Sequence, residues 1–102
     1  MARFDVFQFR ASGVPLVLDA QASLLSSLTS RVVVPLVPAP LATREQFPRL
    51  KPTLMINGEA FTLITTDLSV VPVRDLGPLV ENIEARHGDD ILAALDFLFS
   101  GF

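Results

Sequence analysis

An Asn57-Gly58 pair separates two short apolar segments, residues 53–56 and residues 59–64. Asn and Gly both tolerate the positive φ angles that the central residues of a type I′ turn require, and this turn joins two antiparallel strands. The pair therefore predicts a β-hairpin, and with it a sheet whose strands run antiparallel.

Further short apolar segments are rich in strand formers; they span residues 4–9, 14–18, 31–37 and 70–73. Turn-prone residues 11–13 predict a hairpin between the first two segments. The apolar, β-branched run over residues 31–37 predicts a strand covered on both faces. Pro35 within this run cannot donate to a strand ladder, so we expect an edge strand or a bulge there. Six short strands with proline-rich connections predict a small antiparallel barrel or sheet.

The C-terminal quarter of the chain has a helical period. Residues 78–86 favour a short helical segment that His87-Gly88 would end. Asp89 is then a suitable N-cap for a final helix over residues 90–99. This reading predicts two helical segments with a break between them.

On a helical wheel, the final helix carries a narrow polar stripe made of Asp89, Ala93, Asp96 and Ser100. The opposite side is apolar, and so are its flanks; these positions are Ile91, Leu95, Leu98 and Phe102, with Leu92, Phe97 and Phe99. This arc is wider than one core-facing side requires, so part of the helix should pack against another partner. A second copy of the chain is the simplest partner. We expect Leu95, Leu98 and Phe99 at such a homodimer interface.

Composition narrows the function classes. A chain of 102 residues predicts one domain spanning residues 1–102. Its formal charge of −3, with eight scattered Lys and Arg, disfavours direct nucleic-acid binding. Cysteine is absent, which excludes disulfides and thiolate chemistry and fits a reducing compartment. No signal peptide and no apolar run of about 20 residues is present, so we expect a soluble, cytoplasmic protein without membrane contact.

The sequence offers few residues for catalysis. His87, the only histidine, lies beside Gly88-Asp89. It is either a general base oriented by a carboxylate or an exposed loop residue, and the second reading is favoured. Asp89-Asp90 is explained more simply by the helix dipole than by metal binding. Neither a Gly-x-Ser-x-Gly elbow nor a phosphate-binding loop occurs. We therefore expect no catalytic residues, no metal and no cofactor, hence a protein that is not an enzyme.

Several short strings, in register over nearly the whole chain, resemble the CcdB toxins of bacterial toxin–antitoxin pairs. They are Leu18-Asp19-Ala20-Gln21 with Leu24-Leu25, residues 31–36, residues 65–73, and Asp90-Ile91 leading to residues 99–102. The resemblance implies an SH3-like antiparallel barrel of the CcdB, MazF and Kid type. It also implies a small three-stranded wing sheet and a C-terminal α-helix at a homodimer interface.

The resemblance also implies an activity. CcdB toxins bind the A subunit of DNA gyrase through the paired C-termini of the dimer and trap the enzyme on cleaved DNA. A CcdA-type antitoxin folds on the toxin and releases it from gyrase. Carried over by position, the gyrase-binding residues here are Leu24, Leu25, Asp96, Ser100, Gly101 and Phe102.

The C-terminal tail departs from the family pattern. The best-known CcdB toxins end in Trp-Gly-Ile, whereas this chain ends in Ser100-Gly101-Phe102. Truncating a large aromatic at an interface hot spot typically costs about 2 kcal/mol or more. In one reading, Phe102 or Phe99 supplies the missing aromatic surface. In the other, the chain is a non-toxic or retargeted relative that sequesters antitoxin.

A different class of function comes from the MazF and Kid toxins, which share the barrel and are endoribonucleases. Such an enzyme needs an Arg with a Ser, Thr, His or Asp partner to transfer a proton at the 2′-hydroxyl. Arg10 and Arg31, with Thr65 or Asp67, are the candidates. The acidic charge of the chain disfavours RNA binding.

Overall fold

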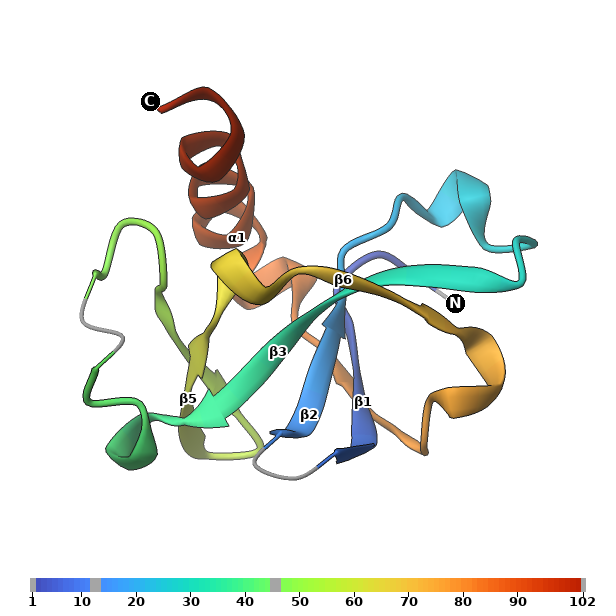
Figure 1. The fold of residues 1–102 in the computed structure, drawn as a ribbon, viewed down its shortest axis with the longest axis horizontal. Coiled ribbons are helices and arrows are strands. Elements are labelled where there is room, and N and C mark those ends of the chain that lie inside the picture. Colours follow the sequence, from blue (N-terminus) through green and yellow to red (C-terminus); the bar gives the residue numbers. More distant parts are fainter. Residues whose placement is uncertain (1, 12–13, 45–46, 102) are drawn as a thin grey trace.

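The predicted hairpin around Asn57-Gly58 is present in the computed structural model, which describes residues 2–11, 14–44 and 47–101 (Figure 1). Asn57 has a φ of 50° and Gly58 a φ of 80°, the left-handed values that a type I′ turn needs. The hairpin joins β4 (Thr53–Ile56) to β5 (Glu59–Leu63). The local turn signal therefore predicted this part of the fold correctly.

The described residues form a mainly β structure with a C-terminal helix. The other strands are β1 (Asp5–Ala11), β2 (Val14–Asp19), β3 (Ser30–Pro38), β6 (Ser69–Pro72) and β7 (Leu79–Asn82). Short 3₁₀ turns connect several of them: η1 (Ser23–Leu25), η2 (Ala39–Leu41), η3 (Thr65–Asp67) and η4 (Val73–Asp75). The helix α1 spans Glu84–Ser100. This content agrees with the CcdB-type fold expected from the resemblance.

In the described part of the chain, the strands form one antiparallel sheet in the order β4-β5-β3-β2-β1-β7. β6 pairs with the first half of β3 and lies outside this path. The sheet curls into a half-barrel, and the expected three-stranded wing corresponds to β4, β5 and the end of β3 (Figure 1). This wing is continuous with the rest of the sheet because β3 runs through both parts.

Apolar side chains fill both faces of the sheet. The larger core cluster lies on one face of the sheet and contains alternate residues of the strands, among them Val6, Leu18 and Val34. The smaller cluster takes their neighbours on the other face, Phe7, Val17 and Val33, with Val71 and Leu76 packed against it. Successive side chains of a strand point to opposite faces, so continuous apolar runs mark strands buried on both sides. This confirms the expectation for residues 31–37.

The expectation that Pro35 marks an edge or a bulge was wrong. β3 pairs with β2 without a register shift across Pro35, so no bulge is present. On its other side β3 pairs with β6 as far as Val33 and with β5 from Leu36 onward. Pro35 turns its carbonyl to that side, where it accepts from Ile64 N–H at 2.9 Å. The N–H that Pro35 lacks would therefore point to the place between the end of β6 and the start of β5. No hydrogen bond of either ladder is lost there.

The expected helical segment over residues 78–86 was also wrong. Residues 79–82 form β7, which pairs with β1. α1 begins directly afterwards at Glu84, whose N–H donates to Asn82 Oδ1 at 3.0 Å. Neither Gly88 nor Asp89 interrupts the helix, so Asp89 is not its N-cap. Gly88 is buried where α1 packs against the ring of Phe4.

Candidate partner-binding surface

The segment between β2 and β3 carries three leucines that face solvent. Leu24 is 90% exposed, Leu25 43% and Leu28 49%, and η1 contains no buried residue. Every residue from 22 to 30 is exposed. Apolar burial therefore does not hold this segment, although apolar side chains are what it presents to a partner.

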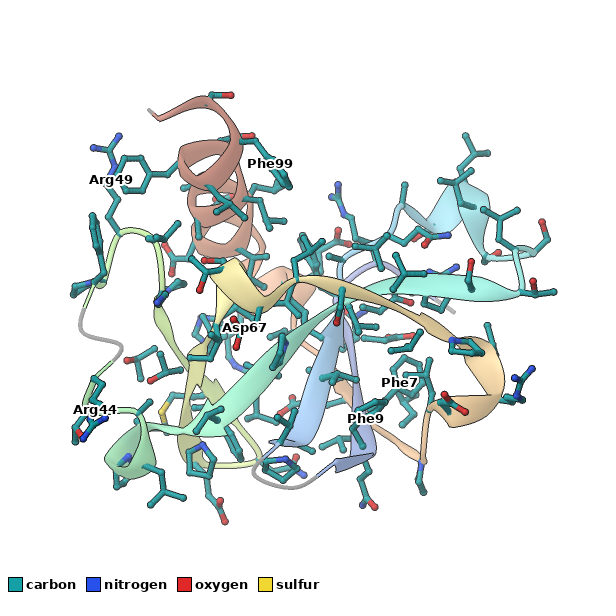
Figure 2. All side chains as sticks on the ribbon, viewed as in Figure 1. Phe7, Phe9, Arg44, Arg49, Asp67 and Phe99 are labelled. Atoms are coloured by element: carbon teal, nitrogen blue, oxygen red, sulfur yellow. The ribbon has the colours of Figure 1, made fainter. Side chains whose placement is uncertain are left out.

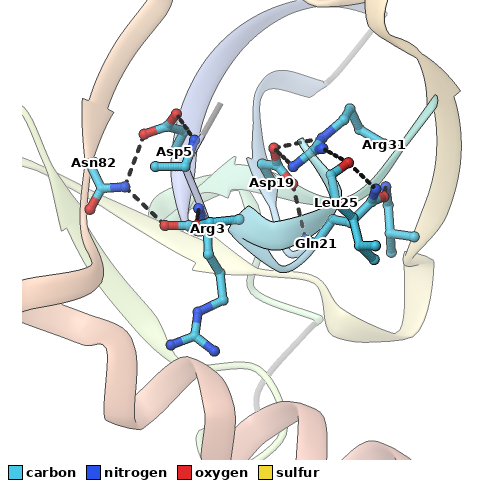
Figure 3. Close-up of polar contacts among 10 residues, drawn as sticks. Arg3, Asp5, Asp19, Gln21, Leu25, Arg31 and Asn82 are labelled. Carbon is cyan, nitrogen blue, oxygen red and sulfur yellow. Dashed lines mark hydrogen bonds and ion pairs between the residues drawn. The ribbon is translucent and has the colours of Figure 1, made fainter. Parts of the chain in front are cut away.

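Hydrogen bonds from a buried ion pair hold the segment instead (Figure 3). Asp19 and Arg31 are fully buried, and Arg31 Nε donates to Asp19 Oδ2 at 2.9 Å. Arg31 Nη2 lies 2.7 Å from the same oxygen as an ion-pair contact and makes no hydrogen bond to the described residues. Arg31 Nη1 reaches outward and donates to the carbonyl of Leu25 at 3.1 Å. One guanidinium therefore joins the core to the exposed turn.

Gln21 adds a second support for the same turn. Its backbone N–H donates to Asp19 Oδ1 at 3.0 Å, and its Oε1 accepts from Val32 N–H at 2.9 Å. Its Nε2 donates to the Leu25 carbonyl at 3.4 Å, and Leu28 N–H donates to that carbonyl as well, at 3.1 Å. The Leu25 carbonyl is thus the point at which the core, Gln21 and the turn meet.

The second half of α1 extends beyond the sheet (Figure 1). The buried residues of the helix are Gly88, Ile91 and Ala94, all before its last six positions. Leu95 still packs against the larger core cluster, but Phe99 is 72% exposed, and Ser100 and Gly101 are exposed. Gly101 ends the helix in the left-handed conformation, with a φ of 77° and its N–H donating to the Phe97 carbonyl at 2.9 Å.

The two flanks of the apolar arc differ. On one flank, Phe97 is covered by the chain after η2: the Phe47 ring lies 5.6 Å from its centroid and the Arg49 guanidinium 4.3 Å. On the other flank, Leu92 and Phe99 are exposed. Figure 2 shows Phe99 and Arg49 on opposite sides of α1. The over-wide arc is therefore partly covered by the chain itself and partly open.

The structure describes five of the six expected gyrase-binding residues. Leu24, Leu25, Asp96, Ser100 and Gly101 are all exposed, and Phe102 lies outside the described residues. η1 and the far end of α1 extend to the same side of the molecule in the view of Figure 1. Of the expected dimer residues, Phe99 is exposed, whereas Leu95 and Leu98 are half-buried. These roles remain predictions.

A comparison with family models now adds to this geometry. The model described as CcdB protein matches residues 3–101. The chain belongs to the CcdB family. Family membership implies the toxin of a toxin–antitoxin system. The match covers both η1 and α1, so the exposed surfaces described above belong to the CcdB-type part of the chain.

The residues proposed for MazF-like chemistry are engaged elsewhere in this CcdB-type structure. Arg31 is buried with Asp19. Thr65 is buried, and its hydroxyl donates to the Leu50 carbonyl at 2.7 Å. Asp67 is exposed in η3, while the side chain of Arg10 lies outside what the structure describes. Arg31 and Thr65 therefore face the protein interior rather than a substrate.

His87 was expected in an exposed loop, but it lies within α1 and is half-buried. Its Nε2 accepts from Met55 N–H at 3.1 Å. Arg86 donates to the Met55 carbonyl at 2.7 Å and to Glu81 at 3.1 Å, and Glu81 accepts from Asn57 N–H at 2.7 Å. These three side chains form a seam that links the hairpin end of β4 to β7, through Glu81, and to the first turns of α1, through Arg86 and His87.

The Asn57 backbone N–H is the main reason that the pKa of Glu81 falls below its ordinary value of 4.5. Arg86 lowers this pKa further, whereas partial burial of the carboxylate opposes the shift.

Within the described residues, no group of three or more His, Cys, Asp or Glu could hold a metal ion. No helix in the described ranges is long and apolar enough to cross a membrane.

Sequence reasoning missed the supporting roles of Asp19, Gln21 and Arg31. All three occur in the strings that resemble CcdB, but the sequence alone does not show that their side chains are in contact. Asp19 pairs with Val33 across β2 and β3, and this register places Arg31 near Asp19. The contact can therefore be inferred only when the strand register is known. The only sequence signal was a charged residue at the start of an otherwise apolar strand.

Proposed function

We propose that this chain is a toxin that binds the A subunit of DNA gyrase and traps the gyrase–DNA cleavage complex. A CcdA-type antitoxin would neutralise it, and the active form would be a cytoplasmic homodimer that is not an enzyme, needs no cofactor and does not itself bind nucleic acid. The observation that carries the proposal is the CcdB match over residues 3–101. The exposed Leu24 and the exposed end of α1 support it.

The proposal is tested with purified protein and gyrase. We expect the chain to bind the isolated A subunit and to accumulate cleaved DNA in a gyrase cleavage assay. Induced expression should arrest growth, and co-expression of the cognate antitoxin should restore it. Leu24→Asp should weaken gyrase binding without unfolding the protein, because Leu24 is 90% exposed. Absence of both gyrase binding and cleaved DNA would refute the proposal.

A second candidate is a non-toxic or retargeted relative that binds only antitoxin. It is favoured by Ser100, an exposed small residue where the family's best-known toxins carry Trp. Tight binding of a CcdA-type peptide, together with no binding of gyrase, would support this candidate.

The variant Ser100→Trp separates the two candidates further. If the tail docks as in the family, the restored aromatic side chain should tighten gyrase binding by roughly thirtyfold, the equivalent of about 2 kcal/mol. Isothermal titration calorimetry measures the change. Leu41→Trp is the matched control, because Leu41 is 76% exposed in η2 and lies outside the expected docking residues. Unchanged or weaker binding by Ser100→Trp would mean that the tail docks differently.

A further inference from the structure

We propose that Arg31 is a positioning residue: through the Leu25 carbonyl it fixes the orientation in which η1 presents Leu24 and Leu25 to gyrase. This inference rests on the proposed function, since it assigns a support to the same docking surface. Arg31 itself is fully buried and cannot contact a partner. Its effect must therefore pass through the turn.

Among the described residues, no buried side chain other than Arg31 holds η1. All its residues are exposed, so the hydrophobic effect does not fix them. The bonds within the turn, Leu25 N–H to the Ala22 carbonyl and Ser26 N–H to the Ser23 carbonyl, close a local loop only. The Ser23 hydroxyl adds one exposed link, to Arg3 N–H at 2.9 Å.

The bond from Arg31 to the Leu25 carbonyl has a charged, buried donor. A hydrogen bond from a charged donor is stronger than a neutral one, and burial of the guanidinium lowers the local dielectric. The planar guanidinium is fixed at Nε and Nη2 by Asp19, so the direction of Nη1 is fixed too. The Leu25 carbonyl must lie where that N–H points. Fixing this carbonyl fixes the peptide plane after Leu25, and with it the orientation of the backbone of η1.

A fixed orientation of η1 favours binding of a partner. Ordering a flexible loop on binding reduces affinity, and a loop already held in its bound form avoids that cost. An exposed leucine on a fixed turn is therefore a better docking group than the same leucine on a loose one. Arg31, with Gln21 as the second donor to the Leu25 carbonyl, supplies this preorganisation.

The test uses Arg31→Lys, which keeps the charge beside Asp19 but replaces the three guanidinium nitrogens by a single ammonium. We expect gyrase A affinity to fall at least tenfold. Gln21→Met is the second variant; it removes the other donor from a half-buried side chain and remains informative if Arg31→Lys does not fold. Ile56→Val, a core truncation in β4, is the control for a general loss of stability and should leave affinity unchanged.

A double-mutant cycle separates positioning from general destabilisation. In a Leu24→Ala/Leu25→Ala background the leucines are gone, so Arg31→Lys or Gln21→Met should weaken gyrase A binding by less than twofold further. An equal loss of affinity in both backgrounds would overturn the proposal, because the effect would not pass through the leucines.

Amide hydrogen exchange gives a readout that does not depend on gyrase. Arg31→Lys should accelerate exchange of the Leu28 N–H, which donates to the Leu25 carbonyl, at least tenfold. The Leu63 N–H, bonded to the Pro52 carbonyl, should be unaffected. If the unmodified chain does not bind gyrase A, the proposed function fails, and the positioning role then stands or falls on this exchange. Equal Leu28 exchange in the variant and the unmodified chain would overturn it.

Discussion

Gly88 is the residue at which α1 packs over the N-terminal part of the sheet. It is buried, and a Cβ added there would lie 3.9 Å from Phe4 Cε2 and 3.4 Å from Glu84 Cγ, ordinary van der Waals distances. Phe4 is itself fully buried with a φ of 67°, a value that costs a non-glycine residue conformational energy. Contacts with the helix and with Arg3 help to offset that cost.

These distances predict that Gly88→Ala stabilises the protein. Alanine lowers the backbone entropy that is lost on forming a helix, which is worth about 0.5–1 kcal/mol in a helix interior. The free energy of unfolding, measured by urea denaturation, should rise by that amount. Ala93→Gly, at an exposed position of the same helix, should lower it by a similar amount. A lower stability of Gly88→Ala would mean that Phe4 cannot accept the added methyl group.

The elements differ in how far the sequence predicted them. The β4–β5 hairpin was predictable because Asn57-Gly58 carries its own turn geometry. β7 was not, because four residues between Pro78 and a helix carry no local strand signal and pair with β1 only through the tertiary fold. The start of α1 was misplaced for the related reason that Gly88 disfavours a helix locally. The packing of α1 against Phe4 overrides that local preference.

Glu81, one of the three side chains of the seam, predicts a pH dependence of the stability of the fold. The pKa of Glu81 is lowered in the folded protein, so its ionised form stabilises the fold at pH values above 4.5. This contribution is lost as the pH falls through the lowered pKa. In Glu81→Gln the amide carries no charge at any pH. We expect the difference in unfolding free energy between the two proteins to shrink as the pH falls from 7 to 3.

Chemical denaturation of both proteins across this range measures the difference. Because other carboxylates titrate in the same range, only the comparison with Glu81→Gln isolates the seam. Parallel pH profiles for the two proteins would show that Glu81 contributes nothing to the pH dependence.

For the whole molecule, the open flank of α1 bears on the expected homodimer. Phe99 is 72% exposed and Leu92 38%, on the flank that Phe47 and Arg49 leave uncovered. Burying such a flank against a second copy would remove apolar area from water at about 25 cal/mol per Å². The arc on the helical wheel indicated a partner, but it could not show that the chain's own Phe47 covers one side.

We therefore expect the protein to sediment as a dimer and Phe99→Asp to sediment as a monomer, because a charge in a dimer interface is costly to bury. The unfolding free energy of the monomeric variant should not be lowered by the substitution itself, because Phe99 has little contact with its own core. Leu41→Asp, at a 76% exposed position in η2, is the control and should remain dimeric. A monomeric unmodified chain, or a dimeric Phe99→Asp, would contradict the expected interface.

The seam between β4 and β7 has a consequence for how this fold can diverge. A sheet closed by backbone ladders keeps its closure under almost any substitution, because every residue but proline brings the same donor and acceptor. Here the polar contacts between the two ends of the sheet come from the side chain of Glu81 in β7 and from Arg86 and His87 at the start of α1. These polar contacts therefore depend on residue identity. We therefore expect single substitutions at these three positions to change how firmly the ends of the sheet are held together while the path of the chain stays the same.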